Sequence, residues 1–219
     1  MLALGTPGAA QARLYHGGRS AGPSNPTNHQ KDQEDFEAAL PTASDTDLPH
    51  LTPSQNVHMT QINEKPIIHR QATARGLVYF SNNRPWELLR EGQGTHKGDV
   101  FSVARIAGIM GAKRTPDVVP LCHPGIGITG VEVDVKLLEP VDRNMTKDGE
   151  TMRYGAMRVT ATVHCQGRTG VEMEAMTATM GAALTVYDML KAVDKGMTIG
   201  GVQLWEKKGG KSGHWRRGE

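Results

Sequence analysis

The stretch MRVTATVHCQGRTGVEMEAMTATMGAALTVYDMLKAV (residues 157–193) contains two hydrophobic periods in succession. From Met157 to Cys165 apolar and polar residues alternate, which is typical of a strand with one buried face. After Gly170 the apolar residues recur at helical spacing up to Val193, which predicts one long helix. A strand that leads into a long helix is therefore the central unit of the predicted fold.

Segments on both sides extend this unit. The stretch ITGVEVDVKL (128–137) alternates in the same way, and the polar residues 139–151 are typical of a long hairpin loop before the next strand. Further elements are a strand at 72–80, a helix that begins after the N-cap Asp99, and a strand at 198–205. The order β-α-β-β-α-β predicts an α+β, ferredoxin-like fold, an antiparallel sheet with both helices on one face.

The surface pattern favours an oligomer. The long helix carries Ala and Met on more than one side, which predicts burial on two faces. The sheet face away from the helices must also be covered if it is apolar, and a second subunit is the simplest cover.

Residues 1–50 differ in composition from the rest of the chain. Gly, Ala, Pro, Ser, Asn and charged residues dominate there without a periodic apolar pattern, which predicts a disordered tail. Its first part contains Arg13 and Arg19, and no acid precedes Asp32, as in a transit peptide. We expect a mitochondrial protein, with a cytoplasmic one as the alternative. The folded domain is expected at 51–213, followed by a C-terminal tail at 214–219.

Overall composition excludes several classes of protein. The formal net charge of +2 gives no strong attraction to nucleic acid or to a membrane surface. No apolar run approaches the roughly 20 residues that span a bilayer. The two cysteines, Cys122 and Cys165, are too few for a disulfide framework and suit a reducing compartment.

Charged residues interrupt the apolar face of the long helix near its end. Asp188 and Lys191 are three residues apart, so both lie on one helical face. The pair is either a solvated ion pair or a device for proton transfer. Lys97, directly before the other predicted helix, opposes the helix dipole, which favours a role in anion binding over a role in stability.

Two further motifs contain candidate site residues. In VPLCHPG (119–125) two prolines hold Cys122 and His123 in a fixed loop. A metal site that joins this pair to His164 and Cys165 is the weaker alternative, because adjacent strand residues point to opposite faces. In GVEMEAM (170–176) the first helical turn carries Glu172 and Glu174, of which one is expected to face a site and the other solvent.

Taken together, these segments resemble the cyclic pyranopterin monophosphate synthase (MoaC) family of molybdenum cofactor biosynthesis. The motifs that carry the resemblance are KGDVF, PLCHP, TGVEMEA, YDM-KAV and the closing KKGGKSG, which occur in this order between residues 97 and 213. The resemblance implies a lyase that converts 3′,8-cyclo-7,8-dihydro-GTP into cyclic pyranopterin monophosphate and diphosphate. It implies the ferredoxin-like fold, no cofactor and no metal, and a homohexamer, a trimer of dimers with sites at the dimer interface.

The resemblance also implies roles for individual residues. Asp188 is the expected catalytic acid or base and Lys191 its partner, both on a buried helix face. The expected substrate-binding residues are Lys97, Leu121, Cys122, His123, Glu172, Met173 and Lys207. The substrate is expected to come from a separate radical-SAM GTP cyclase, because the chain lacks the cysteine motif of that enzyme.

One segment departs from the family pattern. The family usually has a strand that reads His-Met-Val-Asp-Val, whereas this chain has His58-Met59-Thr60-Gln61-Ile62. The missing acid keeps open a second hypothesis, a ferredoxin-like oligomer that binds nucleotides without catalysis. A third hypothesis is the metal-binding module of Cys122, His123, His164 and Cys165.

Overall fold

The computed structural model describes residues 56–92, 95–141 and 152–218. The predicted tail at 1–50 and most of the predicted loop at 139–151 lie outside the described residues. The disordered tail, the transit-like segment and the mitochondrial location therefore stay predictions. No helix within the described ranges is both long enough and apolar enough to cross a membrane.

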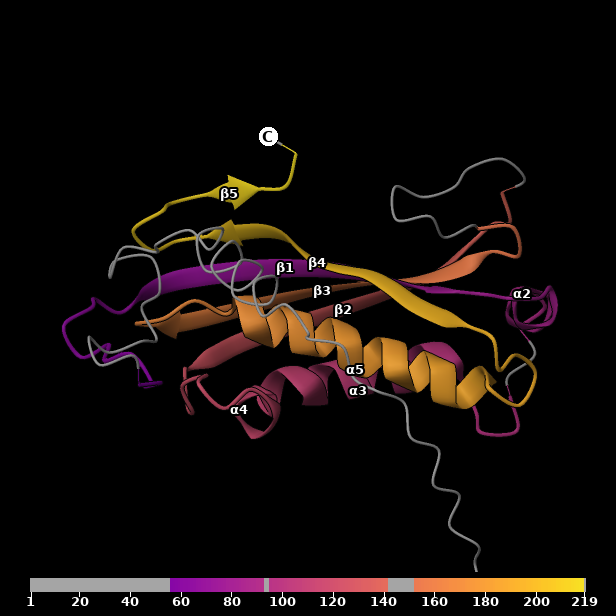
Figure 1. Cartoon of the computed structure of the whole chain (residues 1–219), viewed down its shortest axis with the longest axis horizontal. Coiled ribbons are helices and arrows are strands. Elements are labelled where there is room, and N and C mark those ends of the chain that lie inside the picture. Colours follow the sequence, from indigo (N-terminus) through magenta and orange to yellow (C-terminus); the bar gives the residue numbers. More distant parts are fainter. Residues whose placement is uncertain (1–55, 93–94, 142–151, 219) are drawn as a thin grey trace, which may run out of the picture. The chain divides into compact units, whose positions relative to one another are not determined.

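An antiparallel sheet forms the centre of the described domain (Figure 1). Its strands are β1 (Ile68–Tyr79), β2 (Ile128–Leu138), β3 (Ala156–Gly167), β4 (Thr198–Lys208) and the short β5 (Trp215–Arg216). Their spatial order is β2-β3-β1-β4-β5, so the first and third long strands lie at the centre. This arrangement confirms the predicted ferredoxin-like fold. β5 pairs with β4 and continues the sheet past residue 213.

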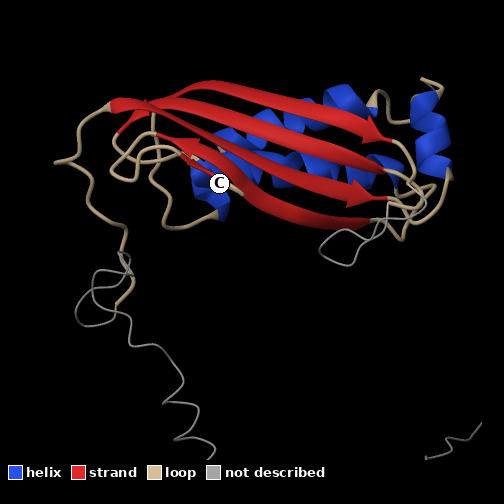
Figure 2. Ribbon diagram, turned by 90° about the horizontal axis from the view of Figure 1, so that it is seen from above, coloured by secondary structure: helices blue, strands red, loops and turns tan. Residues whose placement is uncertain are grey.

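The two long helices, α3 (Val100–Lys113) and α5 (Glu172–Leu190), cover one face of the sheet (Figure 2). Asp99 is the N-cap of α3 as predicted, since its carboxylate accepts a hydrogen bond of 3.0 Å from the backbone N–H of Phe101. Two short helices, α2 (Arg84–Arg90) and α4 (Thr115–Val118), have no counterpart in the predicted order.

The long helices pack closely because α3 has glycine where it meets α5. A Cβ atom on Gly111 would lie 2.8 Å from the backbone oxygen of Thr177. On the sheet side of α5, Ala178, Ala182 and Val186 are fully buried against the apolar residues of the strands. The core therefore lies between the sheet and the two helices, as the alternating strands and the periodic helices predict.

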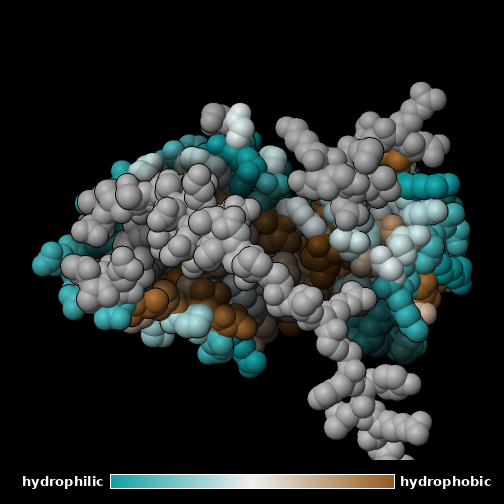
Figure 3. All heavy atoms as spheres, in the orientation of Figure 1, coloured by the Kyte–Doolittle hydropathy of each residue, from teal (hydrophilic) through white to brown (hydrophobic). Residues whose placement is uncertain are grey.

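The sheet face away from the helices is polar. The hydroxyl groups of Thr73 and Thr162 are hydrogen-bonded there at 2.9 Å, and Arg75 lies over the ring of Trp205. The exposed apolar surface lies on the helices instead, where Ile106, Val118 and Leu184 are more than half exposed (Figure 3). An apolar groove of about 680 Å³ runs along α5, lined by Met110, Val118, Met173, Met176, Met180 and Leu184, among other residues. The apolar face that a second subunit could cover is therefore the helical face, not the face of the sheet away from the helices.

Candidate active site

The predicted acid–base pair lies at the C-terminal end of α5. Asp188 Oδ1 is 2.7 Å from Lys191 Nζ, and Oδ2 is 2.8 Å from Lys97 Nζ. Lys97 Nζ also donates to the backbone oxygen of Asp188 at 2.9 Å. The structure therefore brings together three of the predicted site residues, although Lys97 and Asp188 are 91 positions apart in the sequence.

The expected burial of this pair is wrong for the single chain. The side chains of Asp188 and Lys191 are 54% and 53% exposed. Hydrogen bonds from Lys191 and then from Lys97 lower the pKa of Asp188 to about 2, and the bond to Asp188 raises the pKa of Lys191. The physical reason is that Asp188 and Lys191 lie on the solvent side of α5, opposite the buried Leu190, so attraction between opposite charges exceeds the small effect of desolvation.

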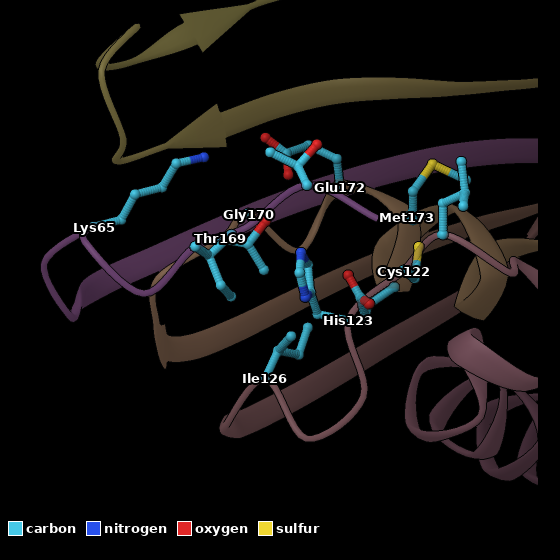
Figure 4. A pocket seen from close by; sticks show the side chains of 12 residues that line it. Lys65, Cys122, His123, Ile126, Thr169, Gly170, Glu172 and Met173 are labelled. Atoms are coloured by element: carbon cyan, nitrogen blue, oxygen red, sulfur yellow. The ribbon is translucent and has the colours of Figure 1, made fainter. Parts of the chain in front are cut away.

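Most of the other predicted residues line a hollow of about 240 Å³ at the N-terminal end of α5 (Figure 4). This hollow, which we call the acidic hollow, contains five of them: Leu121, Cys122, His123, Glu172 and Met173. The loop before β2 supplies the first three, and the first turn of α5 supplies the other two. Thr60 and Lys65, from the segment before β1, close the hollow on another side.

Glu174 also lines this hollow, although only Glu172 of the two acids was among the expected substrate-binding residues. Its side chain is only 3% exposed, and burial raises its pKa to about 7, with a smaller contribution from the charge of Glu172. Both acids therefore line the hollow, and the expectation that one of them faces solvent is wrong. The signal was present, because Glu174 lies one turn before Ala178 on the buried stripe of α5.

Cys122 completes the polar lining of the acidic hollow. Burial and then the charge of Glu174 raise the pKa of its thiol. The thiol therefore stays protonated at neutral pH, which does not favour a cysteine nucleophile.

A second hollow of about 420 Å³ adjoins the acidic hollow, and the two share Lys65, Thr169 and Gly170. We call it the basic hollow, because Lys65, Arg70, Arg168 and Lys211 line it. Arg70 donates to the backbone oxygens of Gly167 at 3.0 Å and Arg168 at 3.1 Å. Within the described ranges no carboxylate forms an ion pair with these four cations, so the basic hollow suits an anionic ligand.

Lys207, the remaining predicted residue, does not line either hollow. Its Nζ donates to the backbone oxygen of Gly209 at 3.4 Å and to the hydroxyl of Ser212. Lys211 of the same glycine-rich arm lines the basic hollow instead. The turns at Gly209 and Gly210, which both have positive φ, reverse the chain and carry Lys211 to this position.

Apart from Lys207, the predicted site residues thus fall into two groups at opposite ends of one helix. Glu172 and Asp188 are 16 positions apart in α5, which corresponds to about 24 Å along the helix axis. The acidic hollow alone is also smaller than the roughly 300 Å³ at which ordinary ligand pockets begin. Within a single chain the structure therefore does not bring these two groups together.

The alternative metal site is not assembled. Cys165 lies in the core, whereas His164 lies on the polar sheet face, where its ring is 5.8 Å from that of His69. These positions confirm that the two residues point to opposite faces. No group of three or more His, Cys, Asp or Glu side chains in the described ranges is arranged to hold a metal ion.

The segment with the altered family motif is not part of a long strand. His58 to Ile62 precede β1, and Thr60 lines the acidic hollow. A threonine therefore stands at the hollow, and the neighbouring Gln61 is exposed.

Comparisons with known proteins identify the family of the chain. The profile of the MoaC family matches residues 59–210. A cyclic pyranopterin monophosphate synthase of Thermomicrobium roseum is 51% identical over 173 residues, which cover 78% of this chain and 93% of that protein. Proteins of the same name from Streptomyces avermitilis and Streptomyces coelicolor are 47% and 46% identical, over 81% and 78% of this chain and 93% and 89% of theirs. The chain therefore belongs to the MoaC family.

Proposed function

We propose that this chain is a cyclic pyranopterin monophosphate synthase, a lyase of molybdenum cofactor biosynthesis. Its substrate is 3′,8-cyclo-7,8-dihydro-GTP, delivered by a radical-SAM GTP cyclase, and its products are cyclic pyranopterin monophosphate and diphosphate. Family membership and the shared name of three relatives support the activity. One observation carries the mechanism. Asp188 and its two lysines lie at the C-terminal end of α5, whereas Glu174 and the basic hollow lie at its N-terminal end.

The carboxyl groups at the two ends of α5 differ in protonation state at neutral pH. Asp188 is a carboxylate at neutral pH, and Lys191 and Lys97 beside it donate hydrogen bonds to its two oxygens. Glu174, whose pKa is about 7, exchanges a proton easily near neutral pH. Opening a purine-derived ring and closing a pyran ring require several proton transfers. Positioned acids and bases each contribute roughly 10²- to 10⁴-fold to such steps.

The basic hollow suits the triphosphate of the substrate. Lys65, Arg70, Arg168 and Lys211 supply fixed positive charges beside the acid–base groups. When the cyclic phosphate forms, diphosphate leaves with additional negative charge, and these cations stabilise that charge. Lys207, the expected lysine of this arm, holds Ser212 in place within the arm.

A two-fold axis through the middle of α5 would unite the half-sites. Met180 lies midway between Glu172 and Asp188, and it lines the exposed apolar groove. If two copies of α5 packed antiparallel with Met180 at the axis, the acidic hollow of one subunit would face Asp188 of the other. An isologous contact of this kind forms two equal sites. A dimer of this kind would be the unit of the expected homohexamer.

A coupled assay tests the activity. A radical-SAM cyclase converts GTP into the cyclic substrate, the purified chain is added, and the oxidised pterin product is measured by fluorescence. The proposal expects pterin only when the chain is present. A folded, oligomeric sample that binds a GTP analogue but forms no pterin would contradict it and support the binding hypothesis.

Complementation tests the shared site separately. Asp188→Asn and Glu174→Gln each inactivate both sites of their own dimer. In a mixed dimer one site carries both changes and the other carries neither. After random exchange of equal amounts of the two variants, about a quarter of the wild-type activity should return. No recovery in samples shown to contain mixed dimers would place both residues in the site of one subunit.

A further inference from the structure

Arg75, on the polar sheet face, forms no ion pair with a carboxylate in the part of the chain that the structure describes. The guanidinium carbon of Arg75 lies 4.1 Å from the centre of the Trp205 ring. Its Nε atom is buried and has no hydrogen-bond partner in the part of the chain that the structure describes. The stacked ring fixes the plane of the guanidinium group and so orients its edge for hydrogen bonds to a ligand.

Two more arginines lie beside Arg75. Arg75 pairs with Thr160 of β3, so Arg158, two residues earlier on β3, shares its sheet face. Arg216 of β5 lies on the same sheet face, on the β4 side of β1. It pairs with Glu206 of β4, and Glu206 pairs with Thr73 of β1, which shares the sheet face of Arg75. Burial and the positive charges of Arg158 and Arg216 lower the pKa of Arg75. We call these three residues the arginine cluster.

The acids on this face are already engaged. Glu206 is 2.7 Å from His214 Nε2 and 3.5 Å from Lys208 Nζ. Asp134 is 3.3 Å from Lys136 Nζ, and Glu132 is 4.0 Å from His164 Nε2. No carboxylate forms an ion pair with Arg75 or Arg158 among the described residues. Arg75 and Arg158 therefore place positive charge on this face that no ion pair with a described carboxylate balances.

The arginine cluster is separate from the basic hollow. Arg70 of that hollow lies on β1 opposite Cys165, a core residue, whereas Arg75 lies opposite Thr160. The two arginines therefore face opposite sides of the same sheet. A ligand held by the arginine cluster would not reach the groups that we assign to the reaction.

We propose that the arginine cluster is a second anion site, which binds an oligophosphate such as diphosphate or the phosphate chain of a nucleotide. Guanidinium groups form paired hydrogen bonds with phosphate oxygens. A chain of phosphates carries several negative charges and can contact arginines from neighbouring strands. A single carboxylate would neutralise the charge of only one of these arginines.

Tryptophan fluorescence tests the proposal, because Trp205 contacts Arg75 directly. Inorganic diphosphate is titrated into the full-length protein, and the wild type should give a saturable change. Arg75→Gln and Arg158→Gln should each weaken this binding roughly tenfold or more, since each removes charge-assisted hydrogen bonds. Arg105→Gln, on α3 at the other side of the sheet, should bind like the wild type. Circular dichroism confirms that each variant is folded.

Two further variants separate this site from the basic hollow. Lys211→Gln should retain the fluorescence change, and Trp205→Phe should lose it. Titrations with GTP and with diphosphate at equal concentrations show whether the base adds affinity. No saturable change in the wild type overturns the proposal, as does equal binding by the wild type and both folded arginine variants. A change that disappears with Lys211→Gln would assign the binding to the basic hollow.

Discussion

The two ends of α5 carry carboxylates in opposite environments. At the C-terminal end, Asp188 is half-exposed between two lysines, and its pKa is lowered to about 2. At the N-terminal end, Glu174 is buried, and this burial raises its pKa to about 7. The same type of group is thus a stable anion at one end and a weak acid at the other. One helix supplies both functions, and antiparallel pairing would place them in one site.

The largest expected effect is on turnover. Asp188→Asn keeps the size of the side chain and removes the charge between Lys97 and Lys191. We expect product formation to fall by roughly 10²-fold or more, because a positioned acid–base group is lost. The coupled pterin assay measures the rate. Asp134→Asn, which changes an acid with a lysine partner on the polar sheet face, is the matched control. Wild-type turnover in the Asp188→Asn variant would remove Asp188 from the mechanism.

The next largest effect tests whether the two ends of α5 come together from different subunits. Met180→Glu places a charge in the middle of the apolar groove, where a second α5 is proposed to pack. We expect the oligomer to dissociate, as measured by light scattering, and the activity to fall with it. Gln166→Glu adds the same charge at an exposed position on β3 and should do neither. A Met180→Glu oligomer of unchanged size and activity would place the interface elsewhere.

A smaller effect is expected on the free energy of unfolding, from the buried Glu174 at the N-terminal end of α5. The pKa of Glu174 is higher in the folded protein than its ordinary value of about 4.3, so the folded protein binds more protons between these values. The free energy of unfolding should therefore decrease as the pH rises towards 7. Glu174→Gln removes this penalty and should be more stable than the wild type at pH 8, by roughly 1–3 kcal/mol.

Denaturant unfolding at pH 5 and pH 8, at one protein concentration, measures this difference. The advantage of Glu174→Gln should be small at pH 5, where the wild-type carboxyl is largely protonated. Glu172→Gln, two residues earlier in the same turn, serves as the control. An equal advantage at both pH values would show that burial of the Glu174 charge does not limit stability.

The hydrophobic periods were sufficient to predict the fold. Alternation on the strands and the long apolar stripe of α5 are local signals, and a residue such as Asp99 marks a helix start by itself. The site was predicted less completely. Lys97 and Asp188 meet only because the loop before α3 packs beside the end of α5, a contact that spacing cannot reveal. The role of Lys211 depends on the turns at Gly209 and Gly210 rather than on charge alone.

The smallest effect concerns the charge network of the exposed end. Lys191 makes the larger contribution to the low pKa of Asp188, and Lys97 makes the smaller one. Removal of either cation destabilises the carboxylate, so the pKa of Asp188 should rise in both Lys191→Met and Lys97→Met, and more in the former. A carbonyl NMR titration of Asp188 measures both shifts, with Lys113→Met as the control. If Lys97→Met left the pKa unchanged, Lys97 would be free of Asp188 in solution and available to bind an anion, as its position before α3 suggests.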